Sequence, residues 1–205
     1  RADTQITNKS GPVRAARVAF GLVYDDAREI KAGIDGFDQV LASQFYPDGS
    51  MKESPLYGHK PIGEDLWRIP EMLRGRRDLY GDGLYKKALQ AFAELATPLG
   101  TQPVLDDTYD TTRVPQRTVD IARIRCGIDM PDPGGPPSDF ALLNSDLRAQ
   151  KRRVPGRALN KYYAGRHLAC LGLGRGAKRI QLYALGEDAQ GHGHRHADPL
   201  NVQLY

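Results

Sequence analysis

Residues 191–205 read GHGHRHADPLNVQLY. Three histidines, His192, His194 and His196, occupy every second position, and the alternating apolar run Leu200–Leu204 follows them. On an extended backbone, residues two apart share one face, so the three imidazoles could converge on one spot. The chain has only 5 histidines, so composition does not explain the grouping. The stretch predicts a β-strand preceded by a functional histidine site, or by an exposed tract that binds metal adventitiously.

Composition sets the class of protein. The chain has 205 residues, of which 40% are hydrophobic and 26% are charged, and these values are typical of a globular protein. No apolar run approaches the roughly 18 residues that a membrane span needs, so we expect no span. The net charge of +4 favours an acidic partner, such as a polyanionic sugar or a nucleic acid. Two cysteines, Cys126 and Cys170, make no disulfide framework.

Residues 11–46 predict two helices, because apolar residues recur there at helical spacing. Asp25-Asp26 separates the two apolar stripes and could cap the second helix, whereas Gly33 and Gly36 weaken the helical pattern. The segment Tyr46-Pro47-Asp48-Gly49-Ser50 then predicts a turn. The stripe residues are Val13, Ala16, Phe20 and Val23, followed by Ile30, Ile34, Phe37 and Leu41.

The rest of the chain changes from helical to strand periodicity. Helices are predicted at 66–73, with a kink or boundary at Pro70, and at 84–95, 119–124 and 138–150. Beyond Pro155, positions 180–184 and 200–204 alternate, and 168–173 is a further candidate strand. This order predicts an α+β protein with a helical domain at 1–150 and the start of an antiparallel β-domain at 151–205.

Four stretches together resemble the heparinase II/III-like and alginate-lyase group of polysaccharide lyases. They are ITNKSG (6–11), YPDGSMKESPLYGH (46–59), TPLGTQPVLDDT (97–108) and GHRHADPLNVQLY (193–205). Their order and spacing are similar to the family's from about residue 6 to 205. The resemblance implies an incomplete α/α toroid of helical hairpins followed by an antiparallel β-sandwich portion, in a chain that is part of a longer enzyme.

The resemblance also implies cleavage of a 4-linked uronic-acid glycan by β-elimination. Tyr57 is then the catalytic acid, and it is also the base if cationic neighbours lower its phenol pKa from the usual value of about 10. His194 acts as base or neutralises the substrate carboxylate, and an unperturbed imidazole pKa of about 6.5 suits either role. Asn8 donates hydrogen bonds to the same carboxylate.

Other positions have supporting roles in this resemblance. Lys9 and His59 are predicted to contact substrate, and Glu53 and Asp107 to hold the loops around the cleft. His196 matches a histidine that binds a structural zinc in several members, and the chemistry itself needs no cofactor. Two departures are notable: Lys9 stands where some members carry histidine, and Gly58 separates Tyr57 from His59.

The predicted partner is an acidic polysaccharide or oligosaccharide, with alginate, oligoalginate and heparin or heparan sulfate as the leading substrates. We expect a periplasmic or secreted protein. The alternative is a fragment or degenerate member that binds an acidic glycan without cleaving it. A nucleic-acid binder has only the basic run Lys151-Arg152-Arg153 in its favour, so no nucleic-acid partner is predicted. The choice of uronate, endo or exo mode and oligomeric state stay open.

Overall fold

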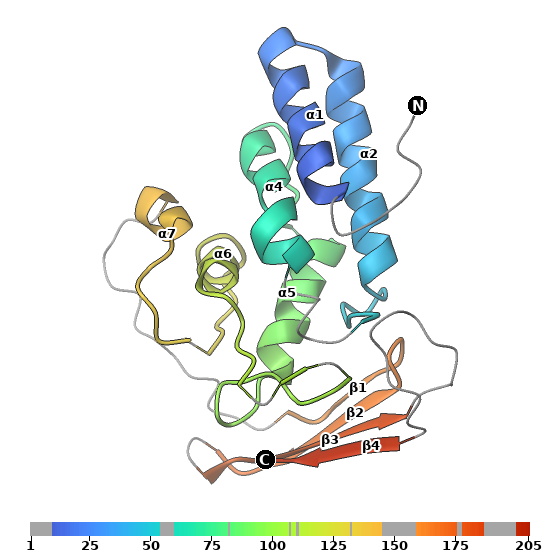
Figure 1. Ribbon diagram of the computed structural model, residues 1–205, viewed down its shortest axis with the longest axis vertical. Helices are drawn as coiled ribbons and strands as arrows, with labels where there is room; N and C mark the ends of the chain where they lie inside the picture. The colour runs from blue at the N-terminus through green and yellow to red at the C-terminus, as the bar shows by residue number, and fades with distance from the viewer. Residues whose placement is uncertain are drawn as a thin grey trace.

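A helical part lies above one antiparallel sheet in the computed structural model, as Figure 1 shows. The structure describes residues 10–53, 60–81, 83–106, 108–109, 111–131, 133–144, 159–175, 178–186 and 200–205. Every described helix precedes every described strand in the sequence. The predicted α+β class is therefore confirmed.

The first two helices form an antiparallel hairpin. Helix α1 spans Ser10–Tyr24, and helix α2 spans Ala27–Gln44. The carboxylate of Asp26 accepts hydrogen bonds from the backbone N–H of Arg28 at 2.9 Å and of Glu29 at 3.2 Å. Asp26 is thus the N-cap of α2, as the sequence predicts.

Gly33 and Gly36 of α2 receive the side chains of Val18 and Arg14 of α1, and the buried face of α1 differs from the predicted apolar stripe. Val13, Phe20 and Val23 are 46%, 51% and 76% exposed. The buried residues of α1 are Ser10, Gly11, Arg14, Ala15, Val18 and Gly21. The close approach of the two helices explains this face, because the side chains of Arg14 and Val18 fit only where α2 has glycine.

The remaining helices enclose the main core. They are η1 (Lys60–Leu66), α4 (Arg68–Leu73), α5 (Leu84–Leu95), α6 (Gln116–Cys126) and α7 (Asp139–Asn144). Pro70 lies in the first turn of α4, where its missing N–H costs no helical hydrogen bond. The largest fully buried side chains of this part include Phe37, Phe45, Leu66, Ile69, Tyr85, Leu89, Phe92 and Phe140.

Four strands form the sheet in the order β1-β2-β3-β4, and each pair is antiparallel. Strand β1 spans Lys161–Tyr163, β2 Leu168–Leu173, β3 Ile180–Gly186 and β4 Leu200–Leu204. The last three match predicted strands. The three residues of β1 are too few to show a period, and the sequence did not predict this strand.

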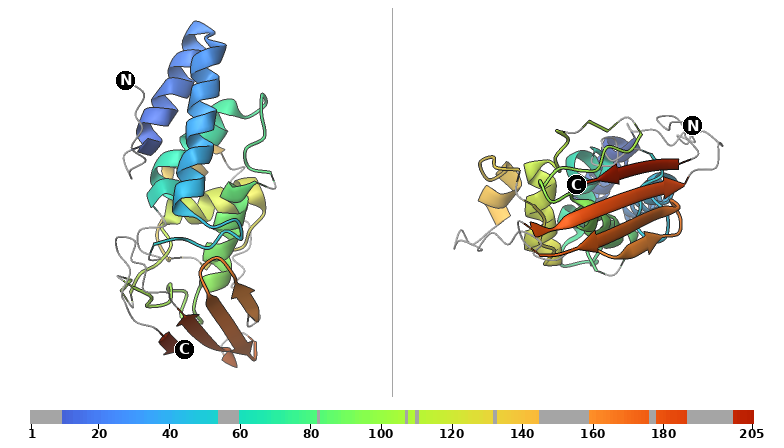
Figure 2. Two further views of the ribbon diagram at one scale, coloured as in Figure 1. Left: turned by 90° about the vertical axis from the view of Figure 1, so that its right-hand side faces the viewer. Right: turned by 90° about the horizontal axis from the view of Figure 1, so that it is seen from below.

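The sheet is apolar on both faces. Its inner face places Tyr163, Leu168, Cys170, Tyr183 and Leu185 against the helical part, all of them buried. Its outer face carries side chains that are each more than half exposed, and no described helix or strand covers it (Figure 2). They are Leu171, Leu173, Ile180, Leu200, Val202 and Leu204. The predicted alternation is therefore correct for β3 and β4, but its apolar members point away from the helices.

The two cysteines lie in different halves of the molecule. Cys126 ends α6 and is partly buried, and Cys170 is buried in β2. Burial raises the pKa of the Cys126 thiol to about 11 and that of the Cys170 thiol to about 12. Both cysteines carry free thiols.

Among the described helices, none combines the length and the apolar character that crossing a lipid bilayer requires.

Candidate functional site

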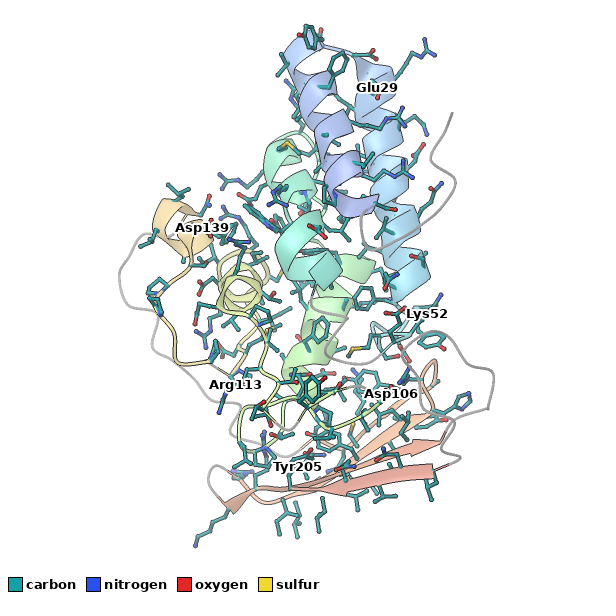
Figure 3. The ribbon with its side chains drawn as sticks, viewed as in Figure 1. Glu29, Lys52, Asp106, Arg113, Asp139 and Tyr205 are labelled. Atoms are coloured by element: carbon teal, nitrogen blue, oxygen red, sulfur yellow. The ribbon has the colours of Figure 1, made fainter. Side chains whose placement is uncertain are left out.

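The described residues beside the motif segments meet at the junction between the helical part and the sheet. Lys52 and Asp106 lie there, above the strands, as Figure 3 shows. Lys52 and Glu53 directly precede the segment 54–59, and Asp106 directly precedes Asp107. The junction is the candidate site.

The turn at Tyr46–Ser50 forms one wall of the junction. The Asp48 carboxylate accepts hydrogen bonds from Ser50 N at 2.9 Å and Ser50 Oγ at 2.6 Å. Its second oxygen accepts from Gly165 N at 2.9 Å, and this bond joins the turn to the β1–β2 connection. Burial alone would raise the pKa of Asp48, but these bonds outweigh it and lower the pKa. The predicted turn is confirmed.

Gly49 is required by the geometry of this turn. Its φ is +86°, and a Cβ added there would lie 2.3 Å from the carbonyl oxygen of Lys87. Both constraints exclude a side chain, because L-residues avoid this φ and the backbone of α5 fills the space. The Asp-Gly pair therefore brings the chain against α5 just before the segment 54–59.

Arg166 connects three parts of the junction. Its Nη1 donates to the carbonyl oxygen of Lys52 at 2.8 Å, and its Nη2 forms an ion pair with the carboxylate of Asp106. The two side chains are only 3% and 2% exposed. A buried charge pair of this kind needs both partners, because either one alone would lose its hydration without compensation.

Strained backbone is concentrated at the same place. Three described non-glycine residues have positive φ, and two of them lie here, each at φ 53°: Asp106, a partner in this ion pair, and His167, which follows Arg166. Left-handed backbone at a non-glycine residue costs free energy and is common at functional sites. His167 is exposed, and its Nδ1 lies 3.2 Å from the hydroxyl of Tyr162.

Both ends of the segment 187–199 leave the sheet beside this connection. Gly186 donates its N–H to the carbonyl oxygen of His167 at 3.1 Å. Leu200 pairs with Gly186 in the β3–β4 register, so the segment both begins and ends there. The described residues on either side of the segment 187–199 therefore lie beside His167, which follows Arg166 in the chain.

A second polar network fastens α5 to the sheet. Glu94 Oε2 accepts from Lys161 Nζ at 2.5 Å and from the Tyr163 hydroxyl at 2.5 Å. Burial would raise the pKa of Glu94, but the hydrogen bonds from Lys161, Tyr163 and Gln90 lower it overall. Burial, together with the Glu94 carboxylate, raises the pKa of Tyr163. Tyr163 therefore stays neutral and acts as a hydrogen-bond donor.

Of the predicted site residues, Glu53 lies within the described part of the chain, half-buried and next to Lys52. The others lie outside the described residues: Asn8, Lys9, Tyr57, His59, Asp107, His194 and His196. The bonds that join the loops come from residues that the sequence did not single out. Asp48, Asp106 and Arg166 make them, and only Asp48 has a local signal, its position in the Asp-Gly turn.

The residues that the structure describes contain no group of three His, Cys, Asp or Glu side chains placed to hold a metal ion. His196, the predicted zinc ligand, is outside them. The described residues therefore provide no zinc site of their own.

The chain was compared with protein-family models and with curated proteins. No protein-family model matches the chain, and no curated protein matches it significantly.

Proposed function

We propose that the protein is a polysaccharide lyase that cleaves a 4-linked uronic-acid glycan by β-elimination. The observation that carries the proposal is the convergence at the junction. Three of the four lyase-like stretches meet residues that are bonded together around Arg166. Arg166 bonds to Lys52, which precedes the segment with Tyr57, and to Asp106, which precedes Asp107. The next residue, His167, bonds to Gly186, which precedes the histidine segment. A lyase needs residues from these stretches to face one sugar.

The fourth stretch, which contains Asn8 and Lys9, adjoins the same helical part. It leads into Ser10 and Gly11 at the start of α1. A Cβ added at Gly11 would lie 2.6 Å from the Cβ of Asp65 in η1. Helix η1 begins at Lys60, just after the segment 54–59. This packing supports a common site for Asn8 and Tyr57.

The reaction removes the C5 proton of the uronate and breaks the bond between C4 and O4, so that a C4=C5 double bond forms. The leaving O4 takes up a proton. Negative charge develops on the carboxylate as C5 loses its proton, and His194, Asn8 and Lys9 would neutralise it. Tyr57 would donate the proton to O4 and, as a phenolate, would accept the C5 proton. Glu53, His59 and Asp107 would hold substrate and loops.

The finer architecture is part of the same proposal. The helical hairpin and the helices below it are proposed to belong to an incomplete α/α toroid, and the sheet to a β-sandwich. The exposed apolar outer face supports a sandwich, since a contiguous apolar patch on a surface usually marks contact with another surface. The proposal also includes a structural zinc bound by His196 and a periplasmic or secreted location. No step of the elimination passes through a metal.

The test is the ultraviolet absorbance of the unsaturated uronate, followed with alginate, heparin, heparan sulfate and hyaluronan. We expect turnover of at least one glycan, abolished in Tyr57→Phe, because only the hydroxyl is lost. Tyr24→Phe is the matched control: Tyr24 is 69% exposed at the end of α1, and its ring contact with Phe20 survives the change.

Two outcomes would contradict the proposal. Full activity in Tyr57→Phe would remove Tyr57 from the mechanism. Binding of these glycans with no rise in absorbance would instead favour the non-catalytic glycan-binding alternative. The same assay tests the register of the histidine tract: His194→Ala should lower turnover more than His192→Ala, and the reverse order would mean that the motif assignment is wrong by two residues.

A further inference from the structure

A turn rich in arginine joins α4 to α5. It reads Arg74-Gly75-Arg76-Arg77-Asp78, and all five residues are exposed. The turn leaves the end of α4 that points away from the sheet (Figure 1). It is held by its own backbone, because Arg76 N and Arg77 N both donate to the carbonyl oxygen of Leu73, at 2.8 and 2.9 Å. The turn is therefore ordered and distant from the junction.

A pocket of about 340 Å³ opens at this turn. Arg74, Arg76 and Arg77 line it together with Pro70, Gly75, Asp78 and Tyr80. Gly75 has φ +88°, and no atom lies within 4 Å of a Cβ added to it, so its backbone is open on that side. The arginines outnumber the single acidic residue of the lining by two.

The positive charge of the pocket is poorly compensated. Glu71, one turn before Arg74 in α4, is already held by Arg125 with two bonds of 2.5 and 2.9 Å. Arg74 approaches Glu71 only to 3.9 Å. In the part of the chain that the structure describes, Arg76 and Arg77 have no side-chain hydrogen bond or ion pair. Asp78 is already an acceptor for Tyr80 N at 2.9 Å.

We propose that this pocket binds the anionic group of an acidic sugar, a carboxylate or a sulfate ester. Guanidinium groups present paired N–H donors that match the oxygens of such groups, and three of them surround one opening. The site is separate from the junction and does not depend on lyase activity. It would hold a remote part of an acidic glycan chain or a separate acidic sugar.

The neighbouring surface favours a sugar over a nucleic acid. A second pocket, of about 360 Å³, shares Arg77 and Asp78 with the first and adds Asp38. The carboxylates of Asp38 and Asp78 can accept hydrogen bonds from the ring hydroxyls of a sugar, which a DNA strand lacks along its backbone. The rest of this second lining includes the apolar residues Phe37, Leu41, Leu84 and Tyr85.

The test is isothermal titration calorimetry of the whole chain with a heparin hexasaccharide and an alginate hexasaccharide. All proteins carry Tyr57→Phe, so that cleavage does not consume the ligand. We expect Arg76→Ala/Arg77→Ala to weaken binding of at least one sugar about tenfold, a loss of the order that charge-assisted hydrogen bonds give. The heparin and alginate arms separate sulfate from carboxylate recognition.

The matched control is Arg175→Ala/Lys178→Ala in the turn between β2 and β3. It removes the same charge from two exposed residues on another surface. We expect it to change affinity by less than about twofold, because long-range charge is screened at physiological salt. Thermal melts would verify that both double variants fold.

Four results would overturn the proposal. They are no binding of either sugar by the parent protein, no loss in Arg76→Ala/Arg77→Ala, an equal loss in both double variants, or a larger loss for a short duplex DNA than for the sugars. Absorbance assays on the protein with Tyr57 intact test the lyase separately. A positive result here with no elimination would therefore contradict only the proposed activity.

Discussion

Arg166 is the residue on which the candidate site depends most. Its guanidinium joins the loop at Lys52, the loop at Asp106 and the connection between β1 and β2. Three chain segments that are distant in sequence are thus fixed by one side chain. Because the ion pair is buried, its loss affects stability as well as the geometry of the junction.

We expect Arg166→Met to lower the free energy of unfolding by about 3–5 kcal/mol, since it leaves the Asp106 carboxylate buried without a counter-charge. Urea denaturation monitored by circular dichroism measures this loss. Arg175→Met is the control, because Arg175 is exposed and its change should stay within about 0.5 kcal/mol. Equal midpoints for the two variants would show that the buried pair contributes nothing.

The sequence predicts local features of the site and misses its long-range bonds. Asp48 and Gly49 have a turn signature, so the turn before the segment 54–59 can be predicted from five consecutive residues. Arg166 and Asp106 are 60 positions apart, and no periodicity or motif relates them. The role of Glu53 in supporting the loops stays a prediction, and the described bonds between the loops belong to Asp48, Asp106 and Arg166.

At the scale of elements, two glycines that lower the helix propensity of α2 allow it to pack closely against α1. Gly33 and Gly36 weaken the helical pattern, but α2 is continuous through both. A Cβ added at Gly33 would lie 2.3 Å from Cγ2 of Val18 and 3.0 Å from the carbonyl oxygen of Arg14. The glycine is therefore needed for helix contact.

Gly33→Ala should destabilise the protein by about 1–3 kcal/mol, the usual cost of overpacking. Helix propensity alone predicts the opposite, a gain of about 1 kcal/mol. Thermal or urea unfolding distinguishes the two. The loss should be smaller in a Val18→Ala background, where part of the clash is absent. If Gly33→Ala stabilised the chain, the helices would have to be farther apart than described.

Periodicity predicts which element forms more reliably than which face is buried. The stripe at Ile30, Ile34, Phe37 and Leu41 predicts both α2 and its inner side, since the last three are buried. The stripe of α1 predicts the helix but not its inner face. Strands β3 and β4 alternate as predicted, with their apolar side chains outward. An apolar pattern identifies a face without identifying its partner.

At the scale of the molecule, polar bonds attach the sheet to the helical part along its whole width. Besides Arg166, Gly165 bonds to Asp48, and Lys161 and Tyr163 bond to Glu94. At the opposite edge, the Tyr205 hydroxyl accepts a hydrogen bond from Val104 N at 3.1 Å. The inner-face side chains of the sheet also belong to the core of the helical part. The two halves should therefore unfold together.

The burial of the two thiols offers a way to observe that event chemically. Alkylating reagents attack the thiolate, and thiols with pKa values of about 11 and 12 form very little of it at neutral pH. Alkylation of Cys126 thus detects unfolding of the helices, and alkylation of Cys170 detects unfolding of the strands. Each thiol stays unmodified until the structure around it unfolds. In a pulse of iodoacetamide along a urea gradient, peptide mass spectrometry should find both sites modified at one midpoint. Earlier modification of Cys170 would reveal a sheet that detaches before the helices melt.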